Sequence, residues 1–488
     1  MGRRPVGELA LMEKGPMGEQ SLMETGLVGE QSLMGRGLVG EQSLMETGPV
    51  GDSQIEIRTL PGLHIGLKPD FKGGDCVSQI SQGFRMMDWD WWVALRDPRD
   101  IWTKHPTLIL NEIVFYVLAL LSLKHAVQNG GRWKYLWLAT VIHGLMTEAV
   151  SYFVPDVDNF WHAQSSVMLL GKRLPLHIIV LYPIIIYQSY AAVSCLGLPW
   201  WAEPFAVGLG DLLIDLPYDI LGIKLLWWTW HDTDPNIYDR HYWVPWTSYI
   251  FHMSFACCFA FLIDLGRKAI TGNASKAVSS GIVKEMAVAL LAGVFTFPLA
   301  VLTQFLPLYH VPHDIYKIHT ENIVMVQLAI YAFIVWTADR SRPQDESSRV
   351  YGVSWLHHEA GQGILLNSLF FLLLVTTAKP EQQVSVGVHQ TLGPCNVSET
   401  LTSVLGQTLY RHTYLCAGDY DEGVFDWHCL PGAVPPPDGA EWYPICGTPF
   451  HLHAEYIYTV AAFCLLGIAF YWTILRGWEQ SARKAKYE

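Results

Sequence analysis

Charged residues are scarce in this chain, and their scarcity argues against a soluble globular protein. Only 16% of the 488 residues are Asp, Glu, Lys or Arg, whereas 51% are hydrophobic, and the mean hydropathy is +0.21. The apolar residues gather in blocks of about twenty, the length that crosses the hydrocarbon core of a bilayer. The sequence therefore predicts an all-α fold, a polytopic transmembrane helix bundle.

The sequence also lacks the motifs of enzymes that use soluble cofactors. It shows no nucleotide-binding loop, no Rossmann fingerprint and no Ser/His/Asp triad, and it identifies no cofactor. No basic residue followed by an apolar h-region opens the chain, so we expect no cleavable signal peptide. The net charge of −13 argues against nucleic acid as a partner. Membrane lipids, and a hydrophobic small-molecule substrate, are the partners that the composition favours.

The first 60 residues form a separate region with an eleven-residue repeat. The unit that begins at Gly15 returns at Gly26 and at Gly37, and a degenerate copy precedes it. An eleven-residue period can build a right-handed helical supercoil, but at least two glycines in each unit oppose helix formation. We expect residues 1–60 to be a disordered repeat tail and residues 61–106 to be a pre-membrane segment.

Nine apolar windows follow, and they predict nine membrane spans. They lie at residues 107–125, 133–154, 174–196, 205–228, 246–265, 282–306, 320–338, 357–378 and 455–475. The first eight spans make up a membrane domain over 107–378, and the ninth leads into a basic tail within 455–488. Basic clusters follow the odd-numbered spans, for example at Lys124, Arg267 and Arg340. The positive-inside rule then puts the N-terminus outside and the C-terminus in the cytoplasm.

The long loop over 379–454 has the composition of an extracytoplasmic domain. It contains Cys395, Cys416, Cys429 and Cys446, beside the N-glycosylation sequon at Asn396. An even set of cysteines next to a sequon indicates an oxidising compartment and two disulfides, with three connectivities open. We expect an integral membrane protein of the secretory pathway or plasma membrane. A second sequon, at Asn273, falls in a predicted cytoplasmic loop and should stay unmodified.

The fourth span carries three carboxylates in the stretch GLGDLLIDLPYDILGIKLLWW, residues 208–228. Asp211, Asp215 and Asp219 are four residues apart, so they project from one face over about 12 Å of helix. Three acids that face lipid would oppose insertion by roughly 8–10 kcal/mol, so we expect them to face the bundle interior or water. Pro217 withholds a backbone donor between the last two acids and should open room for a ligand.

Neighbouring spans carry polar residues of the same kind, namely His143 and Glu148 in the second span and His252 in the fifth. We expect Glu148 to meet the aspartates across the bundle. Desolvation and like charge would there leave at least one carboxyl neutral and able to donate a proton. We interpret His252 as a hydrogen-bonded core residue. Lys224 is a candidate partner for the acids, although its phase on the helix is poor.

Histidine and aspartate also gather at the predicted outer ends of the spans. These stretches supply His231, His241, His310 and His313. Histidine with carboxylate suits zinc or iron, which makes these residues candidate metal ligands. None of the stretches has the HxxxH or HxxHH spacing of membrane di-iron oxygenases, so we assign no metal to them.

Three runs together resemble the central part of the carotenoid hydratase family of bacterial and archaeal membrane proteins. They are GKRLPLHIIVLYPIIIYQSY, GLGDLLIDLPYDILGIKLLWWTWHD and YWVPWTSYIFH, within residues 140–260. The resemblance implies hydration of an isoprenoid double bond, with Asp211, Asp215 and Glu148 as acid and base and Asp219 in support. The Cys-rich loop and the final spans depart from the pattern of that family.

Aromatic residues near the acids suit the same chemistry. Faces of aromatic rings can stabilise a cation, so Trp228, Trp230 and Trp246, with His143, are candidates for lining the substrate site. An interfacial aromatic belt is the alternative explanation for the tryptophans. A proton- or cation-coupled transporter would also use a Pro-interrupted acidic helix. A non-catalytic receptor or scaffold, whose acids pair with buried partners, is the third hypothesis.

Overall fold

The computed structural model describes residues 89–487 except residues 274, 341–354, 388 and 421–422, and it describes no side chains beyond residue 475. Long helices dominate this part of the chain, as predicted for a membrane helix bundle. The repeat tail over 1–60 and most of the segment over 61–106 lie outside the described residues. The main helices are α4 (Pro106–Asn129), α5 (Trp133–Phe153), α8 (Glu203–Lys224), α9 (Trp246–Gly266), α10 (Ile282–Ala300), α11 (Thr320–Arg340), α12 (Glu359–Thr377) and α13 (His453–Tyr487).

Two helical runs contain prolines and π-helical turns. The first passes from α6 (Leu176–Tyr182) through Pro183–Tyr187 into α7 (Gln188–Val193). In the second, α10 continues as π-helical turns over Val301–Ile315, past Pro307 and Pro312. Proline removes a backbone donor from the i→i−4 ladder, which accounts for the changed hydrogen-bond pattern at these places.

Seven helical runs in the described residues are long and apolar enough to cross a membrane. They are Pro106–Asn129, Leu176–Leu196, Trp246–Thr271, Ile282–Ile315, Thr320–Arg340, Glu359–Thr377 and His453–Leu475. These runs support an integral membrane protein, and they correspond to seven of the nine predicted spans. The other two predicted spans are the helices α5 and α8. They are 21 and 22 residues long but carry charged residues, among them Glu148 and the three aspartates.

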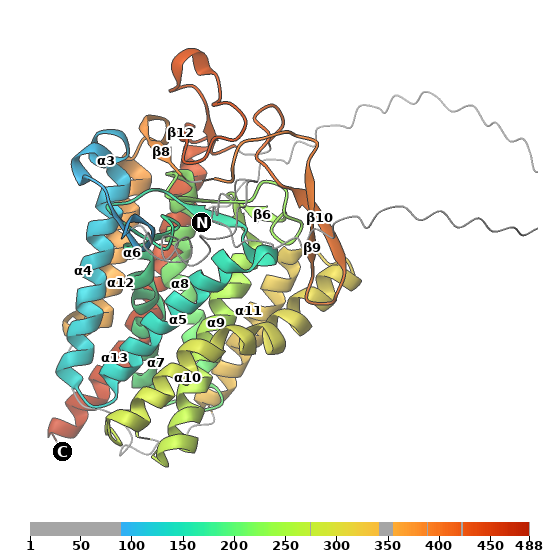
Figure 1. The fold of residues 1–488 in the computed structure, drawn as a ribbon. Coiled ribbons are helices and arrows are strands. Elements are labelled where there is room, and N and C mark those ends of the chain that lie inside the picture. The colour runs from blue at the N-terminus through green and yellow to red at the C-terminus, as the bar shows by residue number, and fades with distance from the viewer. Residues whose placement is uncertain (1–88, 274, 341–354, 388, 421–422, 488) are drawn as a thin grey trace, which may run out of the picture. The chain divides into compact units, whose positions relative to one another are not determined.

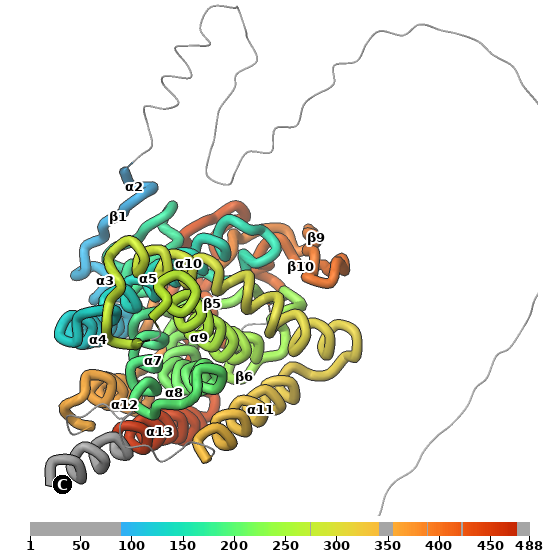
Figure 2. Tube along the Cα trace, turned by 90° about the horizontal axis from the view of Figure 1, so that it is seen from below, coloured from blue at the N-terminus to red at the C-terminus, as the bar shows by residue number. Residues whose placement is uncertain are grey.

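The acidic helix α8 lies inside the bundle. Figure 2 shows α8 and α9 side by side and surrounded by the other long helices. The side chains of Asp211, Asp215 and Asp219 are each only 1% exposed. Helix α8 continues through Pro217, and the neighbouring Ile214 carbonyl accepts a hydrogen bond of 3.1 Å from the Asn367 amide. The aspartates therefore avoid contact with lipid because their helix is enclosed by others.

Short strands and loops cover one end of the helices (Figure 1). A three-stranded antiparallel sheet has the order β11-β12-β8, and β9 pairs with β10 as a hairpin. The strands of this loop region are β8 (Val384–Val386), β9 (Ser398–Thr402), β10 (Thr408–His412), β11 (Phe425–Asp426) and β12 (Pro444–Gly447). Near the same end lie α2 (Trp89–Trp92), α3 (Pro98–Lys104), β1 (Val93–Leu95), β2 (Phe160–His162), β3 (Val167–Leu169), β4 (Leu174–Pro175), β5 (Trp228–Trp230), β6 (Arg240–His241) and β7 (Val244–Pro245).

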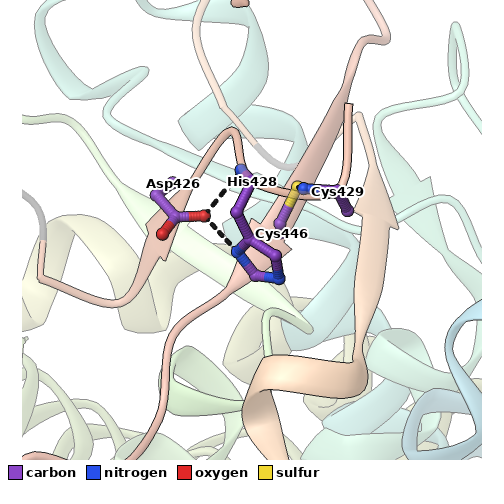
Figure 3. Close-up of a disulfide and its surroundings, with 4 residues drawn as sticks. All are labelled: Asp426, His428, Cys429 and Cys446. Atoms are coloured by element: carbon purple, nitrogen blue, oxygen red, sulfur yellow. Dashed lines mark hydrogen bonds and ion pairs between the residues drawn. A yellow bond between two sulfur atoms is a disulfide. The ribbon is translucent and has the colours of Figure 1, made fainter. Parts of the chain in front are cut away.

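Two disulfides join the four cysteines of the loop region, as predicted. Cys395 pairs with Cys416 and Cys429 pairs with Cys446, which selects one of the three connectivities. Figure 3 shows the second disulfide beside Asp426, which accepts hydrogen bonds from the backbone and the ring of His428 at 3.0 and 2.5 Å. Asn396, next to the first disulfide, is exposed.

The predicted cytoplasmic loops meet at the other end of the helices. Arg132 is fully buried there and donates hydrogen bonds to Glu285 (2.8 Å) and to the Asn273 carbonyl (2.6 Å). Lys276 pairs with Glu203, and Lys124 lies 3.1 Å from Glu359. These three basic residues thus have acidic partners. The two sequons consequently lie at different ends of the bundle.

The predicted end of the fourth span requires a correction. The apolar run continues to residue 228, but α8 ends at Lys224, and Trp228–Trp230 form strand β5. Strand β5 pairs with β2, with Trp230 opposite Phe160 and Trp228 opposite His162. The apolar residues at this position are buried by strand pairing above the helices, and hydropathy alone does not distinguish such a strand from the end of a span.

Candidate functional site: an acidic chamber

A cavity of about 320 Å³ lies among α5, α6, α8, α9 and the run that continues α10. We call it the acidic chamber. Its volume is in the range of pockets that bind small molecules. No Lys or Arg of the described residues lines it. Its titratable acids and histidines are Glu148, Asp156, Asp215, Asp219, His162, His252 and His310.

Helix α9 supplies partners to the acids of α8. The two ring nitrogens of His252 lie 3.3 Å from Asp211 Oδ2 and 3.0 Å from Asp215 Oδ2. Ser248 donates a hydrogen bond of 2.7 Å to Asp219 Oδ2. The contact with Asp211 has the geometry of a hydrogen bond, whereas the contact with Asp215 is an ion pair by distance. Both ring nitrogens thus lie beside carboxyl oxygens of α8.

The cluster of His252 and the three aspartates carries more negative than positive charge. With one positive imidazolium and three carboxylates its formal charge is −2, and the sum is the same if the imidazolium proton sits on a carboxyl. Among the described residues no donor reaches Asp215 Oδ1 or Asp219 Oδ1. An uncompensated buried charge is unfavourable in a low dielectric. The cluster therefore favours binding of further protons or of a cation.

Glu148 brings a fourth carboxyl to the chamber from α5. Its Oε1 accepts a hydrogen bond of 3.0 Å from Tyr182, and its Oε2 lies 3.5 Å from His162 Nε2. Glu148 is 9% exposed and lines the same cavity as Asp215 and Asp219. Carboxyl groups from two different helices consequently face one chamber.

Aromatic rings form much of the remaining lining. Trp228 and Trp230 have ring centroids 5.1 Å apart, and Phe160 lies 5.4 Å from Trp230. Tyr218 stacks on Trp228 at 6.0 Å. The pairing of β2 with β5 holds these rings together at the strand-covered end of the chamber. Phenylalanines of α9 and of the α10 run extend the apolar wall, namely Phe251, Phe255, Phe297 and Phe305.

The hairpin β9–β10 completes the chamber from the disulfide-bonded loop region. Residues 402–404 belong to the lining. The hairpin is anchored by Arg411, whose side chain is 5% exposed and donates to Asp234 at 3.0 Å and to Glu399 at 2.5 Å. Arg411 also donates to the Asp158 carbonyl at 3.1 Å. The loop region thus takes part in the site, which the sequence did not suggest because this hairpin is far from α8 in the chain.

The structure places the other predicted lining residues differently. Asp211 is buried next to His252 and does not line the chamber. Two further candidates, Trp246 and His143, also lie outside the lining, because Trp246 stacks on His241 at 4.8 Å and His143 packs against Phe255 at 5.9 Å.

His252 is hydrogen-bonded inside the bundle, as interpreted from the sequence, and its partners are the α8 acids Asp211 and, by distance, Asp215. The interpretation of Lys224 is corrected. Lys224 does not pair with the acids but donates to Thr448 Oγ1 and to the Pro449 carbonyl, both at 3.0 Å. Ser248 and His252 are four residues apart, as are Asp215 and Asp219. This matched spacing is the signal in the sequence that could have identified the pairing of α8 with α9.

The four histidines considered as metal ligands do not form one group. His231 pairs with Asp232 at 3.2 Å, and His310 and His313 both contact Asp314, at 2.9 and 2.8 Å. The ring of His241 contacts the Tyr249 hydroxyl at 2.9 Å, and burial lowers the pKa of His241 against a smaller opposing effect of Glu321. Among the described residues, the groups with suitable spacing for a metal include Asp215, Asp219 and His252 but none of these four.

Comparisons with known proteins give one match at the level of a family. The model of a family described as "Domain of unknown function (DUF7802)" matches residues 75–476, which include the helices and the loop region that form the chamber. No curated protein and no solved structure shows a significant match. The function is therefore inferred from the site.

Proposed function

Given that the chain belongs to the DUF7802 family, whose model matches residues 75–476, we propose a function from the acidic chamber: a membrane enzyme that modifies a lipid or isoprenoid by acid/base chemistry. The observation that carries this proposal is the meeting of Glu148, Asp215 and Asp219, from two helices, on one largely apolar cavity. An apolar wall accommodates the hydrocarbon of the substrate, and the carboxyl groups are the reactive groups in contact with it.

The proposed reaction is hydratase-like. A protonated carboxyl of the Asp215–Asp219 pair donates its proton to a double bond, which leaves a cation on the substrate. Water adds to that cation, and a carboxylate takes the released proton, so that alkene and water give an alcohol. Glu148, held by Tyr182, is placed to act as this base. Asp211 does not itself line the chamber, and its proposed role is to position His252, which does.

A proton- or cation-coupled transporter is the second candidate. It is favoured by the π-helical turns at Pro183–Tyr187 and Val301–Ile315, since Ile185, Val301 and Phe305 of these segments line the chamber. Irregular helices beside a polar cavity are typical of transporter binding sites. In this reading the acids bind the coupling ion and do not react with a lipid.

Lipid analysis of matched cells tests the enzyme proposal. Cells that express the wild type, the variant D215N/D219N, or the control D264N are compared by untargeted mass spectrometry of total lipids. Asp264 is a buried aspartate of α9 that accepts a hydrogen bond from Tyr190 at 2.7 Å, outside the chamber. We expect a species that has gained the mass of water with the wild type and D264N but not with D215N/D219N. Identical lipids in all three, with all proteins folded, would contradict the proposal and favour transport.

We propose in addition that α5 and α8 complete nine spans, with the disulfide-bonded loop region outside and the C-terminus in the cytoplasm. Asn396 should then be glycosylated and Asn273 should not, because only the first lies in the lumenal or extracellular compartment. Endoglycosidase treatment should increase the gel mobility of the wild type and of N273Q but not that of N396Q. A shift that is lost in N273Q and kept in N396Q would reverse the proposed orientation.

A further inference from the structure

The lining of the acidic chamber restricts the charge of its ligand. Its acids are Glu148, Asp156, Asp215 and Asp219, and no Lys or Arg of the described residues faces it. A phosphate or carboxylate group in the chamber would meet these acids with no Lys or Arg to neutralise it, and the lining histidine His252 already lies between Asp211 and Asp215. Bringing like charges together in a medium of low dielectric is strongly unfavourable. Anionic lipids are therefore poor ligands for this chamber.

A cation, in contrast, would find two kinds of favourable contact. Asp215 Oδ1 and Asp219 Oδ1 receive no donor from the described residues, so they can accept from an ammonium group or lie beside one. The ring centroids of Phe160, Trp228 and Trp230 are 5.1 to 6.3 Å apart. Clusters of aromatic rings recognise substituted ammonium ions through cation–π interactions. Carboxylates and an aromatic cluster thus line the same cavity.

The size of the chamber argues for an organic cation over a single metal ion. About 320 Å³ is enough for a group of many atoms, and phenylalanines form an apolar wall along it. Asp215, Asp219 and His252 have a spacing that a metal ion could use, but a single ion would fill only a small part of this volume and would leave the apolar wall unoccupied.

We infer that the ligand of the acidic chamber is an amphiphilic organic cation, a lipid or isoprenoid that carries an amine or quaternary ammonium group. Its positive charge is neutralised by a carboxylate of the Asp215–Asp219 pair, and its hydrocarbon packs against Phe251, Phe255, Phe297 and Phe305. The inference rests on the proposed function in that it takes the chamber as the substrate site. It goes further because it names the class of lipid.

A pair of isosteric probes tests the inference. Phenylpropyltrimethylammonium is compared with its neutral carbon isostere, in which a tert-butyl group replaces the trimethylammonium group. Binding of each probe to the full chain in lipid nanodiscs is measured by calorimetry. We expect the wild type to bind the cation at least about tenfold more tightly than the isostere, which corresponds to about 1.4 kcal/mol. Reference titrations into empty nanodiscs subtract partitioning into lipid.

Variants of the chamber acids test whether the preference for the cationic probe arises in the chamber. D215N/D219N should bind the two probes equally, while D264N should discriminate as the wild type does. If the double variant does not fold, D215N and D219N separately should each reduce the ratio of the two affinities. Equal binding by the wild type, or discrimination that survives removal of both acids, would overturn the inference. The cationic probe can bind selectively even if the lipid comparison shows no product that has gained water. A product that has gained water can likewise appear even if the probes bind equally. The two experiments therefore test the two proposals separately.

Discussion

Replacing Glu148 with glutamine should lower turnover of the lipid substrate by about 10²–10⁴-fold, the usual contribution of a general acid or base. The glutamine carbonyl can still accept the hydrogen bond that Tyr182 donates to Glu148 Oε1 at 3.0 Å, so the fold and the shape of the chamber should be kept. The amide cannot take up the proton that water releases. The ratio of product to precursor in cell lipids measures the loss.

The matched control is Glu112→Gln on the neighbouring helix α4. Glu112 is also buried, at 3% exposure, and its carboxylate accepts hydrogen bonds from Ser166 at 2.9 and 2.6 Å, but it does not line the chamber. E112Q should therefore change protein stability and leave the product ratio close to that of the wild type. Equal losses in E148Q and E112Q would show that Glu148 acts only through the fold.

Replacing His252 with glutamine should destabilise the protein by about 3–5 kcal/mol, because removal of one partner leaves buried carboxylates uncompensated. The ring of His252 lies within 3.3 Å of both Asp211 and Asp215, and a glutamine side chain brings no positive charge to replace it. Thermal unfolding in detergent, compared under identical conditions, measures the loss of stability.

Removal of one acid should partly rescue this variant. The double variant H252Q/D215N loses one carboxylate together with the positively charged imidazole. It should therefore be more stable than the sum of the two single losses of stability implies. Additive losses would mean that His252 and Asp215 do not interact electrostatically. That result would contradict the charge imbalance on which the account of the chamber depends.

The helices were largely predictable from the sequence because a bilayer imposes a simple physical constraint. Apolar runs of about twenty residues predict spans, and the observed helices begin and end within a few residues of most of them. The stacking of Asp211, Asp215 and Asp219 on one face follows from helical periodicity alone. The disulfides follow from the even set of cysteines, although their connectivity depends on the fold.

Contacts between distant segments were not predictable in the same way. Nothing local indicates that residues 402–404 line a cavity beside Asp219, because their place depends on how Arg411 anchors a hairpin to Asp234. From the sequence, strand β5 is predicted as the end of a span. The reason is that residues buried by strand pairing and residues buried in lipid are apolar alike. His252 resembles any core histidine until the register of α9 against α8 is known.

The central claim is that the chamber holds a protonated carboxyl group in apolar surroundings, and labelling with dicyclohexylcarbodiimide tests it most directly. This apolar reagent modifies carboxyl groups that are protonated and accessible from an apolar phase, and peptide mass spectrometry locates the adduct. The account predicts labelling at Asp215, Asp219 or Glu148, and no such labelling by a water-soluble carbodiimide. Labelling that is absent from all three residues, or confined to acids outside the chamber such as Glu112 and Asp264, would contradict it.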